Sequence, residues 1–320
     1  MTNNSENLIK KYLSGDRRAL ARLISIIENE EDQGYQLLDK IYHRVGKAFR
    51  IGITGPPGAG KSTIVDSLTK IYRQQNKSVG IIAVDPTSPF TGGALLGDRI
   101  RMSDLFTDEG VFIRSMATRG NPGGLAQRTQ EVADLLDGFG MDIIIFETVG
   151  VGQSELDIVG AADATVVVLV PESGDSIQAM KAGLMEIADI FVINKADREG
   201  ADRTVLEIQQ VLEFKEKKLS WQPPVLKTTA NIGQGIKQVE KCLNDFLLFL
   251  KKSDLINQRL EQRMENYTRQ IIRERILAEF WGADQERKFE QAIEQIVSKK
   301  QSPYLVSEQL IEEFLDKKNE

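Results

Sequence analysis

Eight consecutive residues near the start of the chain limit its fold more than any other segment. Residues 55–62 read Gly-Pro-Pro-Gly-Ala-Gly-Lys-Ser, after an apolar run at 51–54 and before a helix-like stretch at 63–72. Glycines between a strand and a helix let backbone N–H groups turn inward around a phosphate. The flanking elements therefore favour a phosphate-binding loop over an ordinary glycine turn. The predicted nucleotide contacts are Gly55, Pro56, Pro57, Gly58, Ala59, Gly60, Lys61, Ser62 and Thr63.

Short apolar runs rich in β-branched residues recur along the chain, and helix-like stretches separate several of them. This alternation is typical of an α/β fold with a doubly wound, mainly parallel sheet. The predicted strands are 49–54, 79–84, 111–115, 143–147, 165–170, 190–194 and 225–228. Ligands of such sheets lie at the carboxyl ends of the strands. We therefore expect the site at that edge.

The two ends of the chain have helical patterns and flank the predicted sheet. Apolar residues recur at helical spacing between residues 8 and 45, and again, among many charges, after residue 251. We expect an N-terminal helical extension over 1–46, a P-loop domain over 47–251 and a C-terminal helical arm over 252–320. An amphipathic stripe shows only that something covers it. The pattern alone leaves open whether the arm packs on its own domain or forms a dimer.

The composition disfavours several classes of partner. The chain has 41 basic and 47 acidic residues, so it lacks the broad positive field with which proteins bind nucleic acid. Cys242 and His43 are its single cysteine and histidine, too few for a transition-metal cluster. The first residues do not resemble a signal or transit peptide. No apolar run approaches the roughly 20 residues that span a bilayer. We expect a cytoplasmic protein without a membrane partner.

Carboxylates near the ends of two predicted strands are candidates for a Mg²⁺ site. Glu147 ends the run at 143–147, where P-loop proteins carry the acidic residue that holds the metal through water. Asp85 directly follows the run at 79–84, and Asp98 lies in a glycine-rich loop. For these two a solvated or capping carboxylate is an equally open interpretation. The predicted metal residues are Ser62, Asp85, Asp98 and Glu147, and the candidate catalytic residues are Lys61, Asp98 and Glu147.

The predicted strand at 190–194 leads into the sequence Asn194-Lys195-Ala196-Asp197. This tetrapeptide indicates which nucleotide base the site binds. Asp197 can accept hydrogen bonds from N1–H and the 2-amino group of guanine, and adenine has neither donor. A site built for that pair can discriminate by about 10⁴-fold. The Lys195 stem would cover the base, and Asn194 would tie this loop to the phosphate loop. Thr229 and Ala230 lie where another base-facing loop is expected. At the other end of the nucleotide, the Gly150 N–H could face the γ-phosphate. The predicted ligands are Mg²⁺ and GTP or GDP.

With these residues placed, the chain resembles the MeaB/ArgK family of GTPases. The segments that carry the resemblance are Gly55–Thr63, Val84–Pro89, Gly92–Met102, Glu147–Glu155 and Asn194–Asp197. Members of the family are chaperones of adenosylcobalamin-dependent acyl-CoA mutases. The resemblance therefore implies a mutase partner and homodimerisation through the C-terminal helices.

The resemblance also assigns roles to charged residues beside the phosphate loop. It implies that Asp85 and Asp98 belong to the metal and switch apparatus, with Asp98 in the first switch, and that Glu147 opens the second. A third switch maps onto Pro171–Lys181, where Asp175 and Lys181 would communicate with the mutase.

Two further functions compete with the chaperone interpretation. An ATP-dependent kinase that regulates amino-acid transport conflicts with the guanine-type loop at 194–197. A metal-insertion GTPase would need clustered Cys and His, which the composition does not supply. No glutamine stands in the water-positioning place after Glu147, and no arginine finger is identifiable. We therefore expect slow intrinsic hydrolysis that the mutase stimulates.

Overall fold

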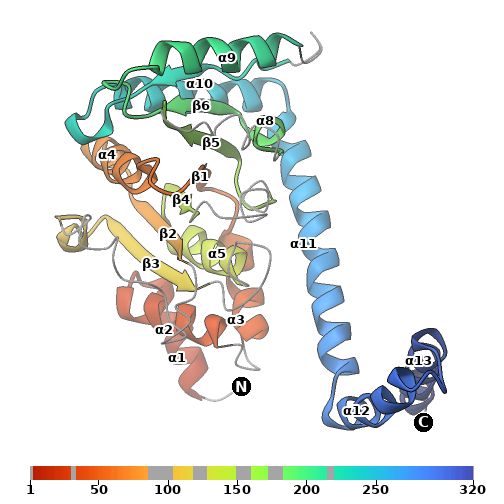
Figure 1. Cartoon of the computed structure of the whole chain (residues 1–320). Helices are drawn as coiled ribbons and strands as arrows, with labels where there is room; N and C mark the ends of the chain where they lie inside the picture. Colours follow the sequence, from red (N-terminus) through yellow and green to blue (C-terminus); the bar gives the residue numbers. More distant parts are fainter. Residues whose placement is uncertain are drawn as a thin grey trace. The chain divides into compact units, whose positions relative to one another are not determined.

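The computed structural model describes residues 3–29, 34–85, 104–117, 128–148, 160–171, 183–214 and 220–319 (Figure 1). Within these residues seven strands form one parallel sheet in the order β3-β2-β4-β1-β5-β6-β7. The strands are β1 (Phe49–Thr54), β2 (Val79–Asp85), β3 (Val111–Ala117), β4 (Ile143–Glu147), β5 (Ala164–Leu169), β6 (Ile190–Ile193) and β7 (Val225–Lys227). They agree with the predicted runs to within two residues at each end. The predicted α/β fold is confirmed.

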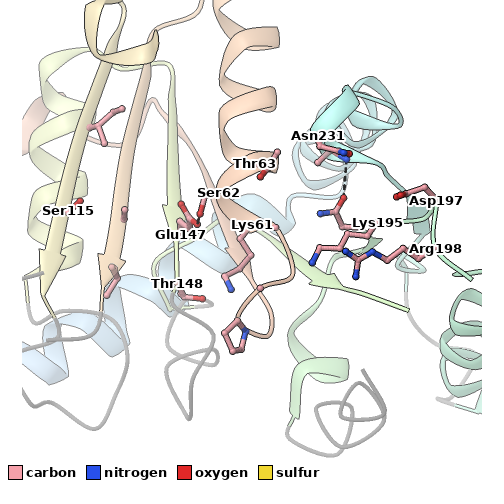
Figure 2. A pocket seen from close by; sticks show the side chains of 18 of the residues that line it. Lys61, Ser62, Thr63, Ser115, Glu147, Thr148, Lys195, Asp197, Arg198 and Asn231 are labelled. Atoms are coloured by element: carbon pink, nitrogen blue, oxygen red, sulfur yellow. Dashed lines mark hydrogen bonds between the residues drawn. The ribbon is translucent and has the colours of Figure 1, made fainter. Parts of the chain in front are cut away.

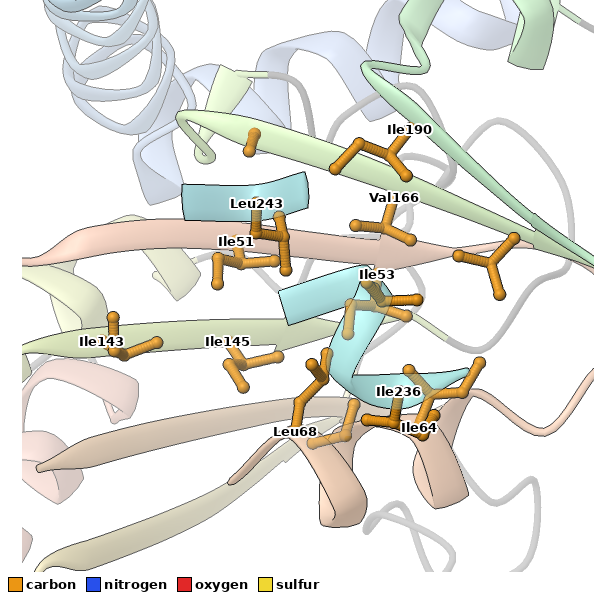
Figure 3. Packing of buried hydrophobic residues seen from close by; sticks show 14 of the residues in the cluster. Ile51, Ile53, Ile64, Leu68, Ile143, Ile145, Val166, Ile190, Ile236 and Leu243 are labelled. Carbon is orange, nitrogen blue, oxygen red and sulfur yellow. The ribbon is translucent and has the colours of Figure 1, made fainter. Parts of the chain in front are cut away.

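Helices cover both faces of this sheet. Successive residues of a strand point to opposite faces, so Ile145 of β4 packs in one apolar core and Ile144 in the other. The core shown in Figure 3 lies between the sheet and helices α4 and α10. The helices that accompany the strands are α4 (Lys61–Gln74), α5 (Thr129–Phe139), α8 (Met185–Ile187), α9 (Ala201–Phe214) and α10 (Ile236–Lys252).

The N-terminal helices share an apolar core with the sheet. They are α1 (Asn3–Leu13), α2 (Arg17–Glu28) and α3 (Gly34–Ile41), followed by the short helix η1 (Tyr42–Arg44). Their buried side chains pack with α5 and with the outer face of β2, β3 and β4. The Tyr12 hydroxyl, which is buried, donates to the Leu135 carbonyl at 2.7 Å. This bond ties α1 to α5.

A buried ionic group joins the first strand to α5 and to the segment that links the N-terminal extension to that strand. Arg50, 2% exposed, pairs with Asp134 at 2.7 Å and with Asp137 at 3.2 Å. Burial alone would lower the pKa of Arg50, but Asp134, Asp137 and Asp163 outweigh burial and raise it. Asp137 also accepts from the backbone N–H groups of 46–48. The connection between extension and sheet is therefore fixed by charge and hydrogen bonding.

The chain divides into two compact units, Met1–Arg259 and Leu260–Glu320. The boundary falls within α11 (Leu255–Phe280), and the second unit continues with α12 (Ala283–Val297) and α13 (Pro303–Asn319). Aromatic rings of 280, 281, 289 and 314 contact one another edge to face in this unit. Within the described ranges, no helix has both the length and the apolar character needed to cross a membrane.

Candidate nucleotide site

The loop between β1 and α4 has a backbone that requires glycine at two positions. Gly55 (φ 136°) and Gly60 (φ 89°) lie in the left-handed region. A Cβ on Gly55 would lie 2.0 Å from the Val168 carbonyl oxygen, and one on Gly60 would lie 2.3 Å from Asn194 Nδ2. Helix α4 begins at Lys61 without a side-chain cap. Its first N–H groups therefore suit an anion at this helix N-terminus.

Lys61 folds over the loop that precedes it. Its Nζ donates to the carbonyl oxygens of Gly55 at 2.8 Å and Pro56 at 3.0 Å, and the residue is 6% exposed. The ammonium group is therefore held against the carbonyl groups of this loop. A phosphate bound there would meet a positive charge at close range.

The candidate metal residues Ser62 and Glu147 meet at the carboxyl end of the sheet. The Ser62 hydroxyl donates to Glu147 Oε1. This contact exists because β4 pairs with β1, which leads into the loop before Ser62. A hydroxyl and a carboxylate are hard oxygen ligands of the kind that Mg²⁺ prefers, so this pair fits the metal.

The other predicted metal and switch residues are described only in part. The backbone of Asp85 ends β2, directly beside β4, so Asp85 lies at the same edge as Glu147. Its side chain is outside what the structure describes, as are Asp98, Gly150, Asp175 and Lys181.

The base loop at the end of β6 is tied to the phosphate loop through Asn194. Its Nδ2 donates to the Ala59 carbonyl at 2.8 Å. Its Oδ1 accepts from the Thr228 hydroxyl at 3.0 Å and from the Ala230 N–H at 3.1 Å. Asn194 is 3% exposed, so these bonds lie out of reach of bulk water. One side chain thus fixes three loops relative to one another.

A cavity of about 490 Å³ connects the phosphate loop with the base loop (Figure 2). Its size is within the range of small-molecule sites. Lys61, Ser62 and Glu147 line one part of it, and Lys195 and Asp197 line another. The other predicted residues that line it are Pro57, Gly58, Gly60, Thr63, Asn194 and Ala230. Gly55, Pro56, Ala59 and Thr229 are not among the lining residues.

Several lining residues were not predicted from the sequence. Arg198 and Asn231 directly follow predicted residues, so their positions in the sequence could have indicated them. Thr148 follows Glu147 in the same way. Ser115 ends the predicted strand at 111–115, so its place at a carboxyl end could have indicated it, whereas no sequence signal marks Phe106.

The fold and this cavity define a P-loop nucleotide-binding protein with a base loop of the guanine type. The family model described as "Methylmalonyl Co-A mutase-associated GTPase MeaB" matches residues 20–285. The chain therefore belongs to the MeaB family of GTPases, as the sequence resemblance indicated.

Individual relatives agree with this assignment. A Pyrococcus abyssi protein assigned to the GTPases is 48% identical over 313 residues, which are 97% of both chains. The mitochondrial methylmalonic aciduria type A homolog of Mus musculus is 33% identical, over 86% of this chain and 71% of its own. A crystal structure described as a LAO/AO transport system kinase has a TM-score of 0.73 and 29% identity, over 98% of both chains.

Proposed function

We propose that this GTPase is a chaperone of an adenosylcobalamin-dependent acyl-CoA mutase such as methylmalonyl-CoA mutase. In this proposal the GTP-bound protein engages the mutase and gates cofactor loading, protects the mutase or reactivates it. Hydrolysis to GDP and phosphate then resets the complex. The observation that carries the proposal is the match of a mutase-associated GTPase family over residues 20–285.

In this proposal, residues at different places along the cavity bind different parts of the nucleotide and its metal ion. Lys61 would neutralise the β- and γ-phosphates, and Asp197 would accept from guanine N1–H and the 2-amino group. Ser62 and Glu147 would hold Mg²⁺, together with Asp85 and Asp98. When bound, Mg²⁺ supplies positive charge that stabilises the phosphates during transfer. In the same proposal Lys195 covers the base, Ala230 and Thr229 shape its loop, and Gly150 senses the γ-phosphate.

Slow intrinsic hydrolysis fits the composition of the cavity. Among its described lining residues the arginine is Arg198, which lies on the base loop, and none of them is a glutamine. A GTPase without a stabilising arginine at the γ-phosphate turns over at about 10⁻³ s⁻¹ or less. The mutase would then supply or organise the missing groups.

Steady-state hydrolysis with and without the cognate mutase tests this proposal. The mutase should raise the GTPase rate, and Asp175→Ala or Lys181→Ala should reduce that increase while basal turnover stays largely intact. Arg203→Ala is a matched control, because Arg203 is an exposed residue of α9 paired with Glu207. If both switch variants keep full stimulation, the segment Pro171–Lys181 has no signalling role. The alternative is that Asp175 only caps a helix expected to begin near residue 177. Thermal melts of each variant test this alternative, because loss of a cap alone should lower stability by about 1 kcal/mol and preserve the stimulation.

An ATP-dependent kinase that regulates amino-acid transport is the alternative, and the similarity to a crystal structure described as a LAO/AO transport system kinase favours it. The two functions differ in nucleotide and in product. GTP consumption that ATP does not compete with, with release of free phosphate, supports the GTPase chaperone. Preferential use of ATP with transfer of phosphate to a protein would support the kinase.

We also propose that the C-terminal arm forms a homodimer. Among residues 260–316, whose burial the structure describes, the buried apolar side chains are Val306 and Leu310, a small core for three helices. An apolar cavity of about 600 Å³ lies between these helices, and Ile276 and Trp281 on its lining are 54% and 42% exposed. A second copy of the arm would cover this surface.

Sedimentation of wild type and Ile276→Arg tests the dimer. The charged side chain should favour the monomer and leave basal GTP hydrolysis unchanged, because Ile276 lies outside the nucleotide unit. A wild-type monomer at micromolar concentration would refute the proposal.

We propose the same domain organisation as the sequence predicts, with an extension (1–46), a GTPase domain (47–251) and an arm (252–320). Limited proteolysis tests these boundaries. We also propose a cytoplasmic location, which cell fractionation tests.

A further inference from the structure

Two buried threonines join the strand before the phosphate loop to the strand that carries Glu147. Thr54 is the last residue of β1 and Thr148 directly follows β4, and they are 0% and 1% exposed. The Thr148 hydroxyl donates to Thr54 Oγ1 at 2.9 Å. The Thr148 N–H donates to the Ile53 carbonyl at 3.2 Å, which extends the β1–β4 ladder one residue past Glu147.

The threonine pair lies next to Glu147 at the nucleotide cavity, so its hydrogen bond acts on the site and not only on the hydrophobic core. Thr148 lines the nucleotide cavity beside Glu147 (Figure 2), although its side chain is almost fully buried. Thr54 directly precedes Gly55, whose backbone is packed against Val168. The hydroxyl pair therefore connects the residue after Glu147 to the fixed beginning of the phosphate loop.

We propose that Thr148 is a positioning residue that, through Thr54, holds Glu147 at the distance from Ser62 that metal binding requires. Without the hydroxyl pair, β4 itself would still pair with β1 and β2 up to Glu147, but the residue just beyond it would rely on the N–H bond to the Ile53 carbonyl. Glu147 could then move away from Ser62, and a carboxylate that must be brought back binds a metal more weakly. The inference rests on the proposed metal role of Glu147.

The test measures how Mg²⁺ slows release of a fluorescent GDP analogue, a readout that does not depend on hydrolysis. Thr148→Val keeps the shape and removes the hydroxyl. Since one buried hydrogen bond is lost, the Mg²⁺ concentration for half-maximal slowing should rise about five- to tenfold. Thr148→Ser, which keeps the hydroxyl, should restore the wild-type value. Thr54→Val should act like Thr148→Val, and the double variant should add little to either change.

Thr69→Val is the matched control. Thr69 is a fully buried residue of α4 whose hydroxyl donates to the Val65 carbonyl at 2.7 Å, and it is not among the lining residues of the cavity. It should lower the melting temperature without changing the Mg²⁺ dependence. If the Thr148 and Thr54 variants behave like this control, the pair is merely structural and the inference is wrong.

Glu147→Gln in the same assay separates this inference from the proposal beneath it. A large loss of Mg²⁺ dependence in Glu147→Gln, with none in Thr148→Val, would overturn the positioning role and leave the metal role intact. An unchanged Mg²⁺ dependence in Glu147→Gln would overturn both.

Discussion

Replacing Asn194 by alanine removes the side chain that joins the phosphate loop to the base loop. The amide makes hydrogen bonds of 2.8, 3.0 and 3.1 Å to Ala59, Thr228 and Ala230. It is 3% exposed, so water cannot readily replace it. Alanine therefore leaves a carbonyl, a hydroxyl and an N–H group without these partners, and the base loop loses its direct tie to the phosphate loop.

The size of the effect follows from these bonds. A buried hydrogen bond contributes about 1 kcal/mol net, so the loss totals about 3 kcal/mol. If the loss falls on binding, affinity for GDP decreases about 150-fold. If it falls on folding, the melting temperature of the nucleotide unit decreases by about 6–12 °C. The two effects together should account for the total.

Titration with a fluorescent GDP analogue and a thermal melt of the same sample measure both quantities. Asn244→Ala is the control, because this amide on α10 bonds to Glu240 at 2.5 Å and is not among the lining residues of the cavity. Asn194→Ala with both affinity and melting temperature unchanged would refute the role given to this side chain. A loss of the same size in Asn244→Ala would show that the effect is not specific to the site.

Four further outcomes are expected. Lys61→Ala should nearly abolish binding of a non-hydrolysable GTP analogue in calorimetry, because the charge that meets the phosphates is lost. Asp197→Asn should shift preference from GTP towards XTP in competition assays, since the amide presents a donor to the base. Arg50→Met should cost about 3–5 kcal/mol in urea unfolding, because buried carboxylates lose their cation. Burial and Asp245 raise the pKa of the Cys242 thiol to about 11. Its contribution to stability should thus be complete below pH 9 and disappear as pH rises towards 11, and denaturation midpoints across that range check the sign.

The sequence predicted the sheet well because each strand is a short β-branched run between helical stretches. Such a run has few alternatives to a buried parallel strand. The phosphate loop and the loop at 194–197 were also predictable, because their residues are contiguous and follow strands. Parallel strands then bring their carboxyl ends to one edge, which places Ser62 beside Glu147.

Contacts between distant segments were not predictable from local patterns. The apolar stripe of the N-terminal helices predicted that something covers it, but not that α5 and the outer face of β2, β3 and β4 do so. The Thr54–Thr148 bond joins residues 94 positions apart, and nothing in the sequence pairs the two threonines. Phe106, which precedes β3, lines the cavity because β3 lies next to β2, an order that the sequence does not state.

The packing of the N-terminal helices has a consequence for synthesis of the chain. Helices α1–α3 leave the ribosome first, yet their apolar faces are covered by α5 and β4, and Tyr12 bonds to a residue 123 positions later. At about 5–20 residues per second, the roughly 100 residues between α3 and the end of β4 take about 5–20 s to make. During this interval the nascent helices expose apolar surface. Newly made chains should therefore depend on chaperones mainly before β4 is complete, and crosslinking of stalled chains of increasing length would locate the point of release.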